Sequence, residues 1–154
     1  MKKLIAALGL SVFCASCAVT VIHDEGINRF TPDSPDATKA IYANMVRHDD
    51  TLYLAGTLGF KPDTRELGDG IEEQTALAID GVEATLARAG ASLADVVQCT
   101  VYLADIADYG AMNGVYKPRF EDNPPARTAL AVAGLPLGAE IEIACIAAAP
   151  DTDD

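Results

Sequence analysis

The stretch PPARTALAVAGLPLGAEIEIACIAAA, residues 124–149, decides the fold class of this chain. Two apolar runs within it, 128–133 and 141–149, have the composition of β-strands. Glycine, leucine and proline fill the short segment between them, residues 134–138, which predicts a turn. The C-terminal part of the chain is therefore expected to form two strands of a sheet.

The residues that precede this stretch predict two helices and three more strands. Residues 108–120 predict a helix with weak propensity, which Pro118 should kink or end. Residues 96–103 predict a strand. The clearest helix begins after Asp69, with Glu72 placed to complete a capping box, and ends before Gly90. Two earlier strands follow from residues 45–48 and 52–55.

This order of elements predicts an α+β fold, a mixed sheet with two helices on one face. No remaining predicted element would cover the other face of the sheet, which is apolar. An uncovered apolar face of this kind predicts that the chain assembles into an oligomer.

Length and charge restrict the function. The 154 residues suffice for one domain, and the formal net charge is −12. Such a field repels nucleic acid and anionic lipid headgroups, so we expect neither as a partner. The field also repels a free anionic substrate, so any carboxylate ligand needs a local cation to hold it.

The N-terminus has the features of an export signal. Lys2 and Lys3 precede an apolar run, residues 4–13, and small residues follow at 14–18. We expect residues 1–17 to be a signal peptide of the lipoprotein type, with Cys17 as the lipidated residue. In such signals a leucine usually stands three positions before the lipidated cysteine, but this chain has Cys14 there. Cleavage after Ala18, without lipid, and a buried N-terminal helix are the alternatives.

The remaining boundaries follow from this assignment. Residues 18–39 are expected to be an extended arm, with a short strand candidate at 19–22 and a loop from Asp24 to Lys39. The main domain is expected over residues 40–150, followed by an acidic tail at 151–154. The mature protein would lie in a bacterial envelope, either periplasmic or held on a membrane only by its lipid.

The two other cysteines, Cys99 and Cys145, lie in apolar strand-like runs. We expect buried free thiols there, with a disulfide between them as the alternative in an oxidising compartment. Neither His23 nor His48 has metal-ligand spacing with a cysteine, so no metal is expected.

Two charged residues in apolar strand segments are candidates for chemistry. Arg127 follows two prolines and an alanine, and its planar fork suits two-point contact with a carboxylate. A structural ion pair to Glu142 or Asp122 is the alternative. Strand alternation predicts that Glu142 points opposite to Ile141 and Ile143, where it could be an ordinary solvent-facing residue.

Several motifs together resemble one known family. They are Pro125-Ala-Arg-Thr-Ala-Leu, Gly134-Leu-Pro-Leu-Gly, Glu140-Ile-Glu-Ile-Ala-Cys-Ile-Ala, Met112-Asn-Gly-Val-Tyr, Leu93-Ala-Asp-Val-Val and Leu52-Tyr-Leu-Ala-Gly. This pattern is similar to the RidA (YjgF-type) enamine/imine deaminase family, over nearly the whole chain from about Ala40 to Ala149. The C-terminal motifs are the more specific ones.

The resemblance implies a chorismate-mutase-like domain that assembles as a homotrimer with clefts between subunits. Family members hydrolyse reactive 2-imino and 2-enamino acids to 2-keto acids and ammonia, without a cofactor. By the same resemblance, Arg127 holds the substrate carboxylate and Glu142 positions the attacking water. The other implied substrate-binding residues are Tyr42, Gly56, Asn113 and Ala129.

Two positions depart from the family pattern. Ala55 stands where a serine is common, a position that bears on the fine substrate preference, and Ala129 stands where a cysteine is common. The substitution at Ala129 matters less, because the family uses the backbone carbonyl there to contact the water.

The expected function is therefore hydrolysis of 2-imino acids in an exported setting. A non-catalytic trimeric module that binds small carboxylates or a partner protein is the alternative. A third hypothesis is that the protein is a structural lipoprotein of the envelope.

Overall fold

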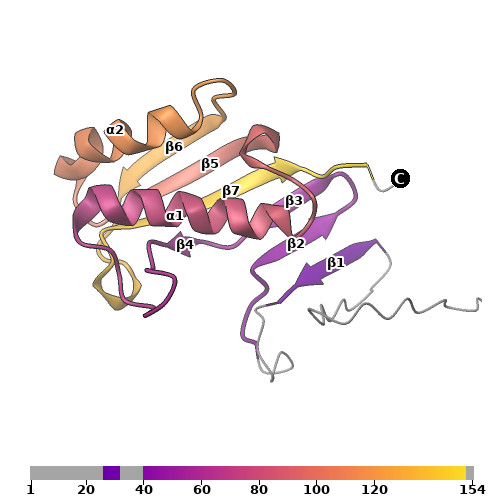
Figure 1. Ribbon diagram of the computed structural model, residues 1–154, viewed down its shortest axis with the longest axis horizontal. Coiled ribbons are helices and arrows are strands. Elements are labelled where there is room, and N and C mark those ends of the chain that lie inside the picture. The colour runs from indigo at the N-terminus through magenta and orange to yellow at the C-terminus, as the bar shows by residue number, and fades with distance from the viewer. Residues whose placement is uncertain (1–25, 32–39, 152–154) are drawn as a thin grey trace, which may run out of the picture.

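The computed structural model describes residues 26–31 and 40–151. Within them a seven-stranded sheet carries two helices on one face (Figure 1). The strands are β1 Ile27–Phe30, β2 Met45–His48, β3 Thr51–Leu54, β4 Thr57–Leu58, β5 Val96–Leu103, β6 Ala126–Ala131 and β7 Ile141–Ala148; the helices are α1 Gly70–Ala87 and α2 Tyr109–Arg119. The predicted α+β class, with both helices on one face, is confirmed.

Some sequence predictions concern residues outside this description. They are the signal peptide over residues 1–17 with its Cys17, the strand candidate at 19–22 and the last residues of the acidic tail. Neither helix of the described part is both long and apolar enough to cross a membrane.

The sheet is mixed. Its strand order is β1-β2-β3-β7-β5-β6, and the short β4 also pairs with β7. Only the β5–β6 pair is parallel, and α2 forms part of the connection between these two strands. This topology puts β6 at an edge of the sheet and β7 near its centre.

Alternation along the central strands separates a core face from an open face. On the core face, residues such as Val101, Leu103, Ile141 and Ile143 are fully buried against the helices. Burying each large aliphatic side chain contributes about 1.5–3 kcal/mol. We call the opposite side of the sheet the open face; the register of the strands places on it Tyr53, Thr100, Tyr102, Leu130, Glu142, Ala144 and Ile146.

The open face carries apolar side chains without a covering helix. The side chains of Tyr53 and Leu130 are 47% and 39% exposed, although both are large and apolar. The prediction of an uncovered apolar sheet face is thus confirmed for the described residues.

The segment predicted as a loop from Asp24 to Lys39 contains strand β1, so that part of the prediction is wrong. Residues Ile27–Phe30 pair antiparallel with β2 and extend the sheet at its edge. A second strand, β4, was also not predicted, since Gly56 was expected to end the preceding strand. Its two residues, Thr57 and Leu58, pair with β7.

The cap of α1 differs from the predicted capping box. Asp69 is the N-cap residue, but its side chain accepts no capping hydrogen bond. The backbone N–H of Asp69 instead donates to the carboxylate of Glu73, one residue beyond the predicted Glu72. A carboxylate in the first turn still meets the positive end of the helix dipole. Helix α2 ends at Arg119, directly after Pro118, as the proline predicted.

The expectation of free thiols at Cys99 and Cys145 is wrong. These residues are direct partners in the β5–β7 register and form a disulfide, with an S–S distance of 2.00 Å. Both side chains are buried in the core. Sequence could not place the two Cβ atoms, because that placement depends on how β5 and β7 pair. The disulfide now fixes that pairing covalently.

Removing this disulfide should lower the free energy of unfolding by about 4 kcal/mol, because the cross-link spans 46 residues and restricts the unfolded chain. Urea unfolding of a Cys99→Ala/Cys145→Ala variant beside the oxidised parent measures the difference. The parent treated with reductant is the matched control, since it keeps the cysteine side-chain volume. The disulfide would be contradicted if Cys99 and Cys145 both reacted with a thiol reagent after unfolding without reductant.

Candidate active site

Arg127 lies on the edge strand β6 and points toward the helices. In the register it is the partner of Cys99, a core-face residue, so its side chain extends beneath α2. Its Nη1 donates to Asn113 Oδ1 at 2.7 Å, and its Nη2 donates to the Tyr109 hydroxyl at 3.1 Å. The guanidinium carbon lies 4.7 Å from the centre of the Tyr116 ring.

These contacts fix the guanidinium without neutralising it. Asn113, Tyr109 and Tyr116 are spaced three, four and seven apart on α2, so they share one helical face. All of them contribute neutral groups: an amide oxygen, a hydroxyl and an aromatic ring. Among the described residues Arg127 forms no ion pair, so the alternative of a structural pair with Glu142 or Asp122 is not observed. The charge stays available for an anionic ligand.

The ring of Tyr116 forms the floor of this arginine site. Its hydroxyl oxygen is buried and has no hydrogen-bond partner in the described structure. Burial raises the pKa of Tyr116 to about 12, although the positive charge of Arg127 opposes the shift. Tyr116 therefore stays neutral throughout the physiological range and acts on Arg127 through its ring alone.

Glu142 lies on the open face of β7. The buried side chains of Ile141 and Ile143 point to the opposite side, which confirms the predicted alternation. Its carboxylate rests directly against Gly56: a Cβ added at Gly56 would lie 1.7 Å from Glu142 Oε1. Only glycine at position 56 therefore lets the Glu142 carboxylate keep its place.

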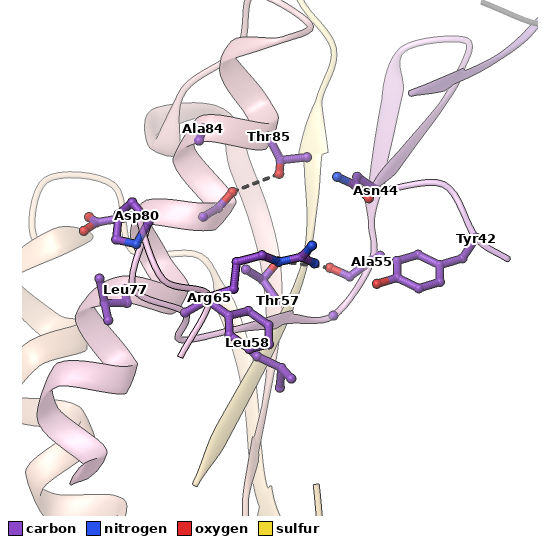
Figure 2. A pocket seen from close by; sticks show the side chains of 14 residues that line it. Tyr42, Asn44, Ala55, Thr57, Leu58, Arg65, Leu77, Asp80, Ala84 and Thr85 are labelled. Carbon is purple, nitrogen blue, oxygen red and sulfur yellow. Dashed lines mark hydrogen bonds between the residues drawn. The ribbon is translucent and has the colours of Figure 1, made fainter. Parts of the chain in front are cut away.

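Tyr42 and Gly56 line a cavity of about 540 Å³ between α1 and the β3–β4 segment (Figure 2). The lining also includes Ala55, Thr57 and the exposed Arg65. The structure thus brings together two of the predicted substrate-binding residues, Tyr42 and Gly56, and places Glu142 against the second. It brings the predicted Asn113 to Arg127, and Ala129 lies two residues further along β6 on the same face.

Within one chain the structure does not bring Arg127 and Glu142 together. They point to opposite faces of the sheet, since Arg127 is in register with core-face Cys99 and Glu142 with open-face Tyr102. They also lie two strands and three residues apart, which puts their backbones ~14 Å from one another. We call the Arg127 group and the Glu142–Gly56–Tyr42 group the two half-sites.

Sequence reasoning missed three residues near these half-sites. Tyr109 and Tyr116 contact Arg127, and their helical spacing with Asn113 could have indicated a shared face. Arg65 lies between the strand predicted at 52–55 and the helix predicted after Asp69, and nothing in its sequence context placed it at a cavity. No group of three or more His, Cys, Asp and Glu side chains in the described ranges is arranged to hold a metal.

Fold and half-sites together define a class: a small α+β domain with an arginine held by neutral groups on an edge strand and a glutamate on the open sheet face. The profile of the family described as Endoribonuclease L-PSP matches residues 31–149. The chain therefore belongs to this family, and its resemblance to the RidA (YjgF-type) proteins is confirmed.

Individual relatives agree with this assignment. The chain is 41% identical to the 2-iminobutanoate/2-iminopropanoate deaminase of Rattus norvegicus over 118 residues, which cover 76% of this chain and 85% of the relative. The structure of RidA from an Antarctic Psychrobacter is similar with a TM-score of 0.68 and 36% identity, covering 71% of this chain and 89% of that one. The structure of E. coli TdcF with bound serine has a TM-score of 0.68 and 29% identity, covering 71% and 88%.

Replacing Tyr116 by phenylalanine should stabilise the fold by about 1 kcal/mol at neutral pH, because it removes a buried hydroxyl group without a partner. The parent should also lose stability as the pH rises from 10, the unfolded value, through about 12, since the fold disfavours the ionised tyrosine. Urea midpoints at neutral and alkaline pH measure both effects. The matched control is Tyr42→Phe, at a position that is 60% exposed; an equal alkaline decline in both variants would contradict the prediction.

Proposed function

We propose that this protein hydrolyses reactive 2-imino and 2-enamino acids to 2-keto acids and ammonia. Relatives about 40% identical are named 2-iminobutanoate/2-iminopropanoate deaminases, which supports the enzyme class predicted from the sequence, an enamine/imine deaminase. The single observation in the structure that carries the proposal is the state of Arg127. It is a fixed guanidinium whose charge is met only by neutral groups, in a chain with a net charge of −12.

The chemistry needs few groups. The free Nη hydrogens of Arg127 bind the substrate carboxylate in two-point contact, which fixes the C=N carbon in place. A protonated imine is already a strong electrophile, so the enzyme has only to position a water molecule. Glu142 orients that water and accepts its proton while the water oxygen bonds to the imine carbon. That proton then passes to the nitrogen. The hydroxyl group gives up its own proton as the C=O bond forms, and the C–N bond breaks to release ammonia and the 2-keto acid.

A homotrimer would unite the two half-sites. Arg127 lies at the exposed edge of the sheet, on β6, while Glu142 belongs to an apolar face that lacks a cover. If the β6 edge of one subunit packs beside the open face of the next, each interface gains one arginine and one glutamate. The same packing would bury the exposed side chains of Tyr53 and Leu130.

The exported setting is part of the proposal. Residues 1–17 would direct export, and Cys17 would carry a lipid that holds the domain in a bacterial envelope, with a periplasmic form as the alternative. The disulfide between Cys99 and Cys145 supports this setting, because such cross-links persist in oxidising compartments and are rare in reducing ones.

A non-catalytic binding module remains the second candidate. TdcF with bound serine supports a ligand of amino-acid size in this fold, which suits either candidate. The two differ at Glu142, because only the enzyme needs a carboxylate to activate water. The family description names an endoribonuclease, but the charge of −12 disfavours a polyanionic substrate.

Replacing Arg127 by alanine should reduce kcat/KM by about 30- to 4,000-fold, because roughly 2–5 kcal/mol of charge-assisted binding is lost. Glu142→Gln should instead keep ligand binding and slow hydrolysis. An amino-acid oxidase generates the imine from alanine, and the release of keto acid is followed with and without the protein. An Arg127→Ala protein as fast as the parent would refute the proposal, and equal losses of binding and turnover in Glu142→Gln would refute the role of Glu142.

Mixing the two inactive variants should restore activity. If each cleft takes Arg127 from one subunit and Glu142 from its neighbour, random mixed trimers of Arg127→Ala and Glu142→Gln chains contain intact clefts in roughly a quarter of interfaces. Co-refolded variants should therefore recover about that fraction of parental turnover. The matched control replaces the second chain by one carrying both substitutions, which cannot form an intact cleft. A mixture no more active than that control would mean that the site is not shared between subunits in this way.

A further inference from the structure

Arg65 is the one cation among the described residues that line the 540 Å³ cavity. Figure 2 shows its side chain pointing from its loop toward Ala55 and Tyr42. The cavity also borders Gly56, against which the Glu142 carboxylate rests. A second guanidinium therefore lines the same cavity as Tyr42 and Gly56, two members of the half-site that includes Glu142.

The charge of Arg65 has no counter-ion in the described structure. The acidic side chain that shares the cavity lining, Asp80, is held by Arg119, whose Nη1 donates to Asp80 Oδ1 at 2.7 Å. Among described residues no carboxylate lies within ion-pair distance of Arg65. As with Arg127, the positive charge is left open on the side facing the ligand space.

The backbone at Arg65 is fixed in a conformation that does not suit arginine. Its φ is +59°, in the left-handed region where glycine or asparagine is favoured and most side chains are strained. Two backbone hydrogen bonds hold the turn: Arg65 N donates to Lys61 O at 3.0 Å, and Lys61 N donates to Glu66 O at 2.7 Å. The tight turn thus aims a long cationic side chain at the cavity at some cost in stability.

We propose that Arg65 binds a second anionic group of the substrate, so that the preferred substrates are 2-imino acids with a carboxylate on their side chain. This inference rests on the proposed function: Arg127 holds the reacting carboxylate, and Arg65 holds the distal one. A cavity of about 540 Å³ is within the usual range for small-molecule sites. A dianion is repelled by the acidic chain more strongly than a monoanion, so it needs this second cation.

The experiment compares the imine made by an amino-acid oxidase from aspartate with the imine made from alanine. The parent should hydrolyse both and prefer the dicarboxylic one. Arg65→Gln should lower kcat/KM about tenfold for the dicarboxylic imine and less than twofold for the other, as expected for one partly exposed charge-assisted contact. Arg29→Gln, which removes one charge on β1 outside the cavity lining, is the matched control and should change neither value.

A second variant separates binding from folding. Arg65→Gly relieves the left-handed strain, so it should raise the Tm while losing the same preference for the dicarboxylic imine. Calorimetric titration with succinate and propanoate tests anion binding without turnover, and only succinate binding should weaken in both Arg65 variants.

The outcomes are distinguishable. A parent that hydrolyses the alanine imine but shows no effect of Arg65 on the dicarboxylic one overturns this inference and leaves the proposed function standing. A parent that hydrolyses neither imine overturns the proposed function, and with it the substrate class inferred for Arg65.

Discussion

Side chains alternate across a β-sheet, and this alternation governs the site because it sends Arg127 and Glu142 to opposite faces. Arg127 shares its face with Cys99 and the helices, whereas Glu142 shares its face with Tyr102 and solvent. No side-chain rotation reverses this, because a strand would have to slip by one residue and expose the core face. The disulfide between β5 and β7 prevents such a slip between these two strands, and so fixes the face of Glu142 on β7. The proposed homotrimer addresses this constraint, because an interface between subunits could bring the two half-sites together where a single chain does not.

The two half-sites are built in different ways. Around Arg127, the neutral groups of α2 hold the guanidinium in position while leaving its charge uncompensated. Around Glu142, the important feature is that Gly56 has no side chain, so the Glu142 carboxylate can lie against its backbone. An arginine held by neutral dipoles and a glutamate placed against a glycine backbone are the two groups that the proposed carboxylate binding and water activation would use.

Sequence reasoning recovered the elements with strong periodic patterns and missed those without them. The central strands and α1 were placed to within a few residues because their apolar periodicity follows from burial in one core. Strand β1 was missed because it lies in a polar segment rich in proline, and β4 because it has only two residues next to Gly56. The face of Glu142 could be predicted from the apolar residues beside it. The face of Arg127 could not, since it depends on how β6 pairs with β5.

The acidic character of the chain gives these few arginines their importance. With a net charge of −12, the long-range field opposes the approach of any anionic substrate, and salt screens that field over about 10 Å. Binding must then come from short-range contacts with cations that have not been neutralised internally. Arg119, paired with Asp80 and Glu83, cannot serve in this way, whereas Arg127 and Arg65 lack such partners in the described structure. Under the proposed function, the arginines that join elements are therefore distinct from the two that would contact the ligand. If the proposed function holds, specificity would depend on where these two cations lie relative to the bound substrate, because the long-range field of the chain does not attract an anion.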